Sequence, residues 1–413
     1  MSFAELPAHD TAAACRWLSI VGIGEDGIEG LTPIARSLIQ GAEIVFGGHR
    51  HLALAAPLIR GTSRSWRSPF EGAIEDVLAH RGRDVCVLAS GDPFVYGVGS
   101  VLLRHIDPRE TVAVPAPSTF SLAASRLGWA LPETVQLSLH GRSLDLVRPH
   151  LHPGARVLAL TSDGEGPAVL ARLLADTGFG RSRLTVLEAL GGARERIRST
   201  TAAAFDLGDI DPLNAVALEV EASPGARVLA RAAGLPDALF EHDGQITKRE
   251  IRAMTLAALS PRRGELLWDV GAGAGSVAIE WMLADPSMRA VAIEAQSDRA
   301  GRIRRNAAAF GVPGLEVVEG AAPAAFEGLA RPDAVFIGGG ATVVLDAAVR
   351  ALRAGGRLVV NAVTVETEAL LLQRRATLGG ELSRIAIARL EPMGGRHGWR
   401  PALPLTQWVW IKP

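Results

Sequence analysis

Residues 265–276 read Glu-Leu-Leu-Trp-Asp-Val-Gly-Ala-Gly-Ala-Gly-Ser. The apolar run Glu265–Val270 predicts a buried strand, and the glycines after it predict a tight loop that leads into a helix. Glycine lets the backbone N–H groups of such a loop approach a ligand closely. Glu294 ends the next predicted strand, about 20 residues later, where a carboxylate can bind both hydroxyls of a ribose. The stretch therefore predicts a Rossmann-like α/β fold that binds an adenosine-containing cofactor.

The spacing of these glycines separates two classes of cofactor. Dinucleotide-binding loops have the pattern G-x-G-x-x-G, whereas this loop has G-x-G-x-G and is followed by no second phosphate-binding feature. The pattern favours an adenosyl group without a pyrophosphate, hence S-adenosylmethionine, and it argues against a dehydrogenase. The alternative is that the glycines only permit a close turn between the strand and the helix. Because Asp269 and Glu294 occur together with the glycines, this alternative is the weaker interpretation.

The first half of the chain carries a second glycine-rich pattern. A G-x-G loop at Gly22 follows one apolar run, and Ser90-Gly91-Asp92-Pro93 follows another, Val85–Leu88. An acidic residue that glycine and proline bracket at the end of a strand forms a rigid turn facing a cleft. Apolar runs alternate with helix-length segments through this half, which predicts βαβ units and a largely parallel sheet. A second ligand site is therefore expected here.

Composition bounds the class of protein. A chain of 413 residues with 48% hydrophobic and 21% charged residues is globular and long enough for two or three domains. The net charge of −1 gives no general attraction to nucleic acid or to anionic membranes, and no apolar run reaches membrane-spanning length. The first fifteen residues contain acidic side chains but no Lys or Arg, unlike a signal peptide. We expect a cytoplasmic enzyme without nucleic-acid or membrane partners.

Metal binding is not expected. Cys15 and Cys86 have neither disulfide nor metal-ligand spacing. The pairs His49/His51 and His150/His152 lack cysteine or acidic neighbours at ligand spacing.

The chain divides into two predicted domains. Residues 14–222 form the first, and the segment 223–238, rich in Ala, Pro, Gly and Arg, reads as a linker. Residues 239–413 form the second, which contains the glycine loop described above.

The second domain resembles class I methyltransferases and, more narrowly, the decarboxylating precorrin methyltransferase family. The narrower resemblance rests on Asp243–Arg252, Glu319–Pro323 and Phe336–Gly340. It implies that the Thr-Lys motif and the G-x-A-P segment line the cofactor pocket. Lys248 is either a weak candidate for gripping substrate or a solvated residue at a helix start. The residues assigned to the cofactor in this half are Thr247, Asp269, Gly271, Gly273, Gly275, Glu294 and Ala322.

Residues 17–220 resemble the tetrapyrrole methylase family. The resemblance rests on the two glycine patterns and on Pro115–Thr119, and the segment Ser138–Arg142 is similar to that of the C5-methylating branch. It implies two αβα lobes with S-adenosylmethionine folded between them, and Glu25 stands where the family usually has proline. The cofactor residues implied in this half are Gly91, Asp92, Pro93, Ser118, Thr119, Thr161 and Gly191. His140 and Arg142 are either a capping pair or, for Arg142, a fork that binds a substrate carboxylate.

The order of the two domains is similar to that of the fused, decarboxylating C5,15-methyltransferases of the corrin pathway. The resemblance implies methyl transfer to C5 by the first domain, and to C15 with loss of the C12 acetate carboxyl by the second. It also implies that two S-adenosylmethionine molecules are consumed, that the substrate is a small-molecule tetrapyrrole and that the chain forms a homo-oligomer, a dimer or a tetramer. Arg396, in a predicted glycine-rich loop over residues 394–400, is a further candidate for gripping substrate. Methylation of transfer or ribosomal RNA is the alternative, although the neutral chain offers no basic stripe.

Overall fold

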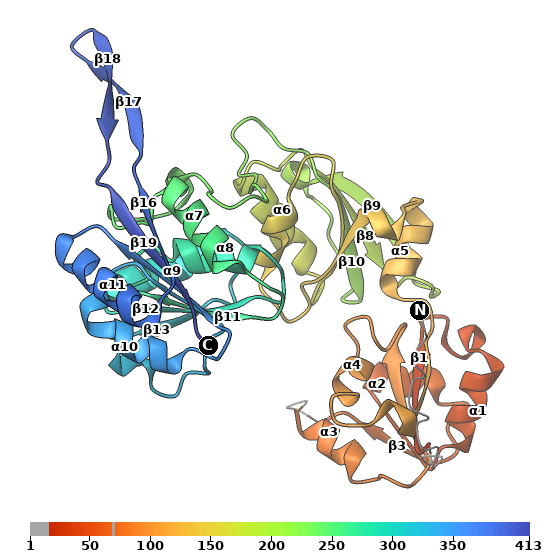
Figure 1. The fold of residues 1–413 in the computed structure, drawn as a ribbon. Helices are drawn as coiled ribbons and strands as arrows, with labels where there is room; N and C mark the ends of the chain where they lie inside the picture. Colours follow the sequence, from red (N-terminus) through yellow and green to blue (C-terminus); the bar gives the residue numbers. More distant parts are fainter. Residues whose placement is uncertain (1–15, 68–70) are drawn as a thin grey trace, which may run out of the picture. The chain divides into compact units, whose positions relative to one another are not determined.

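The computed structural model describes residues 16–67 and 71–413 (Figure 1), and the chain divides into two compact units. The first unit comprises the described residues up to Arg142 together with His152–Ala226, and the second comprises Ser143–Leu151 and Arg227–Pro413. The predictions made for residues 1–15, Cys15 included, lie outside the described residues.

The first unit begins with a five-stranded parallel sheet in the order β3-β2-β4-β1-β5. Its strands are β1 (Leu18–Ile23), β2 (Ile44–Gly47), β3 (Thr62–Ser65), β4 (Val85–Ser90) and β5 (Thr111–Val114), and its helices are α1 (Pro33–Gly41), α2 (His49–Ala55), α3 (Glu71–Leu78) and α4 (Val98–Leu102). Successive side chains of a strand face opposite sides. In β4, Val85 and Val87 join one core cluster while Cys86 and Leu88 join another, so both faces of the sheet are covered, as βαβ units require.

A second sheet in the first unit has the order β6-β7-β10-β8-β9. Its strands are β6 (Thr134–Ser138), β7 (Arg156–Leu160), β8 (Arg183–Glu188), β9 (Arg196–Thr201) and β10 (Asn214–Glu219), with helices α5 (Thr119–Leu127) and α6 (Gly166–Asp176). Only β6 and β7 pair in parallel, and the other pairs are antiparallel. The expectation of a largely parallel first half is wrong for this sheet. The short connection from β8 to β9 cannot make the crossover that parallel neighbours need.

The second unit contains a seven-stranded sheet in the order β13-β12-β11-β14-β15-β19-β16. Its strands are β11 (Leu266–Val270), β12 (Arg289–Glu294), β13 (Glu316–Glu319), β14 (Ala334–Ile337), β15 (Arg357–Ala362), β16 (Glu381–Ile385) and β19 (Leu405–Ile411). The helices are α7 (Arg249–Leu259), α8 (Ser276–Leu283), α9 (Ser297–Ala309), α10 (Ala341–Ala351) and α11 (Val365–Leu378). Strands β11 to β15 are parallel and β19 is antiparallel to β15. Core clusters cover both faces, which confirms the predicted α/β class.

Short 3-10 helices connect the larger elements. They are η1 (Gly27–Gly30), η2 (Pro108–Glu110), η3 (Leu131–Glu133), η4 (Leu144–His150), η5 (Ala202–Ala204), η6 (Asp237–Leu239) and η7 (Ala324–Phe326). Although η4 falls within the predicted first domain, its segment belongs to the second unit, where a side chain added at Gly311 would meet Pro149 at 2.4 Å.

A two-stranded hairpin projects from the second unit (Figure 1). It consists of β17 (Ala388–Met393) and β18 (Arg396–Pro401), which among the strands of residues 16–67 and 71–413 pair only with each other. The expected glycine-rich loop over 394–400 is therefore wrong in extent. Gly394 and Gly395, both with positive φ, make the turn, and Arg396 already lies in a strand.

A close backbone approach joins β1 to the end of β4. A Cβ atom at Gly22 would lie 1.9 Å from the Gly91 carbonyl oxygen and 2.6 Å from the Ala116 nitrogen, both of which are backbone atoms that cannot rotate away. The carbonyl of Gly91 also accepts the Ala116 N–H at 3.1 Å.

We therefore expect Gly22→Ala to destabilise the first unit by about 1–3 kcal/mol or more, as overpacking does. Gly41→Ala makes the same chemical change in α1, where a Cβ meets nothing within 4 Å, and it should leave stability unchanged or raise it. Calorimetric unfolding of the full chain measures both variants. Equal midpoints for the two would contradict the steric argument.

Candidate functional site

A cavity of about 600 Å³ lies in the first unit, within the range of small-molecule sites. The ends of β1 and β4 contribute one side, including Gly24 and Ser90, and the ends of β6, β7 and β8 contribute the other. The predicted cofactor residues among its lining are Gly91, Asp92, Ser118, Thr119 and Thr161. Neither Pro93 nor Gly191 is part of the lining. Pro93 packs closely against Gly97 and Gly99. The Gly191 N–H donates a hydrogen bond to the Glu195 carboxylate at 2.6 Å.

The turn after β4 is built by its own residues. Gly91 has a φ of +53°, where a residue with a side chain would be strained, and a Cβ there would also meet the Pro117 carbonyl at 2.6 Å. The Asp92 carboxylate accepts the Phe94 N–H at 2.8 Å. Ser118 caps α5 by accepting the Ser121 N–H at 3.1 Å. Ser118 and Thr119 both line the cavity, so the first turn of α5 borders it. The free N–H groups of this turn favour polar or anionic groups of a ligand.

Thr161 connects the cavity to the interior of the second sheet. Its buried hydroxyl donates to Asn214, whose amide nitrogen donates to the carbonyls of Asp163 and Asp211 at 2.9 and 2.8 Å. The Thr161 carbonyl is 3.2 Å from His140 Nδ1. This chain of bonds fixes both Thr161 and His140 at the cavity.

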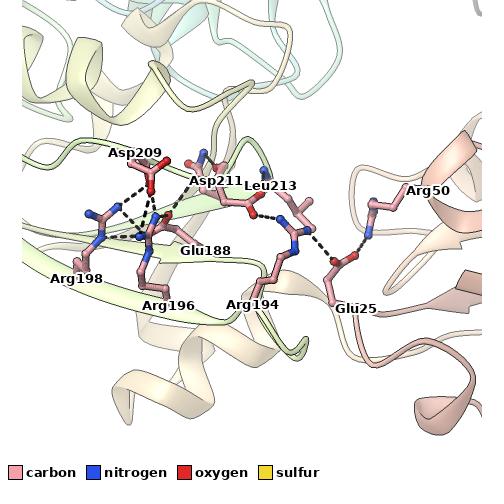
Figure 2. A network of polar contacts seen from close by, with 10 residues as sticks. Glu25, Arg50, Glu188, Arg194, Arg196, Arg198, Asp209, Asp211 and Leu213 are labelled. Atoms are coloured by element: carbon pink, nitrogen blue, oxygen red, sulfur yellow. Dashed lines mark hydrogen bonds and ion pairs between the residues drawn. The ribbon is translucent and has the colours of Figure 1, made fainter. Parts of the chain in front are cut away.

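A network of arginines and carboxylates links the two sheets of this unit (Figure 2). Glu25, after β1, pairs with Arg50 and lies 3.6 Å from Arg194 on the β8–β9 loop. Arg194 also pairs with Asp211, before β10. Glu25 and Arg50 line the cavity, so an ionic link bridges the two sheets at its edge.

Glu188, at the end of β8, does not line the cavity, and its carboxylate points toward Arg196 and Arg198 (Figure 2). It is fully buried, pairs with Arg196 and Arg198 at 2.7 and 3.0 Å, and accepts the Asp211 N–H at 2.8 Å. Burial alone raises the pKa of its carboxyl, but these bonds outweigh burial and lower it. Glu188 is therefore a structural anion, and its neighbours Leu187 and Leu190 line the cavity instead.

His51 is a cavity residue whose place the sequence did not reveal. Its Nε2 lies 2.9 Å from Arg50 Nη2 and 2.8 Å from the Ser90 hydroxyl. Burial, together with the charge of Arg50, lowers the pKa of His51 to about 4. His51 is thus neutral at physiological pH and holds Arg50 and Ser90 in place.

Arg142 lies beside the cavity. Its guanidinium carbon is 5.6 Å from the centre of the Tyr96 ring, a cation–π distance, and Tyr96 lines the cavity. The Tyr96 hydroxyl donates to the Gln136 carbonyl at 3.1 Å. An exposed cation at this edge can meet an anionic group of a bound molecule.

The predicted site residues of the second unit surround the loop after β11. Gly271, Gly273 and Gly275 all have positive φ, which only glycine adopts without strain. The Glu294 carboxylate accepts the Gly273 N–H at 2.8 Å and the Gln296 N–H at 3.1 Å. Glu294 is therefore fixed against the loop at the end of β12.

Two further predicted segments are brought to this loop. A Cβ at Gly273 would lie 3.1 Å from the Gln245 carbonyl, so the segment leading to Thr247 and Lys248 runs beside the loop. The Gly320 N–H donates to the Glu294 carbonyl at 2.9 Å, which places the segment of Ala322 next to Glu294.

A buried ion pair, missed from the sequence, supports the segment of Thr247. Arg252 is fully buried, pairs with Glu280 at 2.5 Å and donates to the Thr247 carbonyl. Lys248, the next residue along the chain, lies exposed at the start of α7.

Among the described residues, no cluster of His, Cys, Asp or Glu could hold a metal ion. Within the same part of the chain, no helix has the length and apolar character to cross a membrane.

Asp269, at the end of β11, is almost completely buried and accepts the Ala278 N–H at 3.0 Å. Burial raises the pKa of its carboxyl to about 7, the Ala278 bond opposes this, and the charge of Glu294 adds to it. Between about pH 4 and pH 7 the folded state therefore keeps a proton that the unfolded chain, with a pKa of about 3.9, has released.

We expect the contribution of Asp269 to stability to be fully present below about pH 4 and to be lost as the pH rises through about 7. The difference in unfolding free energy between wild type and Asp269→Asn should change by at most about 1.4 kcal/mol per pH unit in that window. Urea unfolding at several pH values measures it. Asp285→Asn is the control. Because a hydrogen bond from Ser287 lowers the pKa of the Asp285 carboxyl, the contribution of Asp285 to stability should be lost as the pH falls and not as it rises. A difference for Asp269→Asn that stays constant from pH 4 to 8 would contradict the raised pKa.

Both halves of the chain match families of tetrapyrrole enzymes. The tetrapyrrole (corrin/porphyrin) methylase family matches residues 18–206, and the precorrin methyltransferase domain matches residues 238–412. A precorrin-6Y C(5,15)-methyltransferase (decarboxylating) of a Sinorhizobium species is 61% identical over 99% of this chain and 100% of its own length. The protein of that name from Mycobacterium tuberculosis (strain CDC 1551 / Oshkosh) is 43% identical over 94% and 98%.

A solved structure is also similar. The crystal structure of the C-terminal domain of precorrin-6Y C5,15-methyltransferase from Rhodobacter capsulatus is 48% identical, covers 45% of this chain and 100% of that one, and has a TM-score of 0.43. Because the sequence identity to the Sinorhizobium relative extends over nearly the whole of both chains, this protein belongs to the family of precorrin-6Y C5,15-methyltransferases (decarboxylating).

Proposed function

We propose that this chain methylates a precorrin at two carbons, C5 and C15, and removes the carboxyl of the C12 acetate as carbon dioxide. The observation that carries the proposal is the presence of two separate cofactor-competent places in one chain of this family. One is the cavity of the first unit, and the other is the glycine loop of the second. We assign C5 to the first unit and C15 with decarboxylation to the second.

Membership of a methyltransferase family implies S-adenosylmethionine as the methyl donor, and the residues present fit it. In the first unit, the cavity combines apolar walls with the backbone of the Gly91 turn and the start of α5. In the second, a buried carboxylate, Glu294, stands where a ribose would lie against the three glycines. We propose one cofactor molecule at each place, two per chain, and no metal.

When bound, the sulfonium supplies an already activated methyl group. The protein's contribution is then alignment, which supplies up to about 7–11 kcal/mol of a barrier when two reactants are held in reacting geometry. Thr161 and the Gly91 turn are positioned by buried hydrogen bonds and steric contact, so they can hold a ligand without rearranging. No nucleophilic side chain is required.

The remaining task is to grip a ring that carries many carboxylates. Arginine suits this task because its planar fork binds a carboxylate with two hydrogen bonds. We propose Arg142 for the first unit. For the second we propose Arg396, on the hairpin, and Lys248, at the start of α7, as weaker candidates. For decarboxylation, the conjugated ring accepts the electron pair, and the site desolvates the departing carboxylate while the others stay bound.

Incubation of the full chain with labelled S-adenosylmethionine and precorrin-6B tests the function. We expect the product to gain two methyl groups, lose one carbon dioxide and form with two equivalents of demethylated donor, as mass spectrometry measures. Transfer RNA offered in a parallel reaction should stay unlabelled. Labelled RNA, with an unmodified precorrin, would overturn the proposal.

Arg142→Ala should raise the KM for the tetrapyrrole at the C5 step, by the loss of a charge-assisted carboxylate bond of about 1.5–3 kcal/mol, which is about ten- to a hundredfold. Arg396→Ala should do the same at the C15 step. Cofactor affinity, measured by calorimetry, should not change in either variant.

Arg400→Ala is the matched control on the hairpin, since Arg400 is already paired with Glu391 at 3.0 Å. If Arg396→Ala and Arg400→Ala have the same KM, Arg396 does not grip the substrate.

A further inference from the structure

C-methylation by the first unit, the proposed function on which this inference rests, releases a proton that some group must accept. When a methyl group replaces hydrogen at a carbon of a conjugated ring, one proton leaves for each methyl gained. The proton acceptor must face the cavity and must have a lone pair that no other group already uses.

The cavity is lined by few groups that could accept a proton. Among the described residues of its lining, they are Glu25, His51, Asp92, Tyr96 and His140. Glu25 is paired with Arg50 and lies close to Arg194. Tyr96 carries a neutral hydroxyl that donates to the Gln136 carbonyl.

His51 is unsuited for a different reason. Its Nε2 faces Arg50, which can only donate hydrogen bonds, so that nitrogen already accepts one. A proton on it would stand beside a guanidinium. Asp92 accepts the Phe94 N–H with one carboxylate oxygen and lies where the resemblance puts the cofactor, so we expect its other oxygen to face the cofactor and not the ring carbon.

His140 has the geometry of a base. Its Nδ1 is 3.2 Å from the Thr161 carbonyl oxygen, which can only accept a hydrogen bond. The proton of the neutral ring is therefore on Nδ1, and Nε2 carries the unshared lone pair. No hydrogen bond to Nε2 forms within the described part of the chain.

The backbone on both sides of His140 is fixed. The Leu139 N–H donates to the Leu160 carbonyl at 2.8 Å, and the Gly141 N–H donates to the Ser162 hydroxyl at 2.9 Å. One hydrogen bond from the imidazole and two from the neighbouring backbone therefore fix His140 against residues 160–162, at the end of β7. The Thr161 carbonyl stays bonded to Nδ1 whether or not Nε2 is protonated, so accepting a proton requires no movement of the ring.

We propose that His140 is the catalytic base of the first unit and takes the proton from the ring carbon that is methylated. The ring carbon forms a bond to the methyl group, whose bond to sulfur breaks with its electron pair going to sulfur. The C–H bond of that carbon then breaks, its electron pair restores the conjugation of the ring, and the proton goes to His140 Nε2. His140 returns the proton to water.

The variant His140→Asn tests this. Its side-chain amide can still donate to the Thr161 carbonyl but has no basic nitrogen, so the local structure is kept and only the base is removed. We expect the rate of C5 methylation to fall about 10²–10⁴-fold, as the loss of a general base produces. A precorrin with one new methyl and without the carboxyl should accumulate, because the second unit is untouched.

Three readouts separate a base from a structural residue. Deuterium at the methylated carbon should slow His140→Asn more than wild type, because proton removal then limits the rate. Added imidazole should restore part of the rate in His140→Ala. Calorimetric affinity of the first unit for the demethylated donor should be unchanged in His140→Asn.

His105→Asn is the matched control, since His105 is exposed in the same unit and does not line the cavity. It should behave as wild type.

The following results would overturn the role of His140 or assign it to another residue. An unchanged C5 rate in His140→Asn overturns the proposal, as does a loss of rate that brings loss of donor binding and no rescue by imidazole. Loss of C5 methylation in Asp92→Asn with full activity in His140→Asn transfers the role to Asp92. A wild-type chain that methylates neither carbon refutes the proposed function itself, and this result is distinct because the C15 product is then missing too.

Discussion

The first unit depends on the contact between two glycines at the carboxyl end of its parallel sheet. Gly22 lies so close to the Gly91 carbonyl that no Cβ fits between them, and the carbonyl in turn accepts the Ala116 N–H. This contact holds the Gly91–Asp92 turn against the segment that leads into α5. Since the turn and the start of α5 both line the cavity, the shape of the site follows from a backbone approach that only glycine permits.

Electrostatics at the two places are arranged differently. In the first unit, arginines and carboxylates neutralise one another around the cavity, and Glu25 offsets Arg50 and Arg194. In the second, two carboxyls lie close together in the interior, and burial keeps Asp269 protonated up to about pH 7 while Glu294 is held by backbone N–H groups. A neutral Asp269 is not repelled by the neighbouring Glu294 carboxylate.

The sequence allowed the parallel sheets to be predicted because buried strands in βαβ units are short, continuous apolar runs, as Val85–Leu88 and Glu265–Val270 show. It did not reveal the antiparallel sheet of the first unit, since β9 (Arg196–Thr201) is a polar edge strand that resembles a loop. The hairpin was missed for the same reason, because Arg396–Pro401 is exposed and pairs only with its neighbour. The predicted site residues stay predictions, although the structure brings five of those of the first unit to one cavity.

Residues that act through distant partners could not be found from local patterns. The spacing of His49 and His51 suggests only a metal pair, whereas His51 contacts Ser90, 39 residues away. The bond from His140 to Thr161 spans 21 residues, and it alone determines which ring nitrogen carries the proton. A capping role for His140, which the sequence left open, and a catalytic role therefore share one bond. That bond satisfies Nδ1 and leaves Nε2 free, so the structural contact is what prepares the imidazole to act as a base.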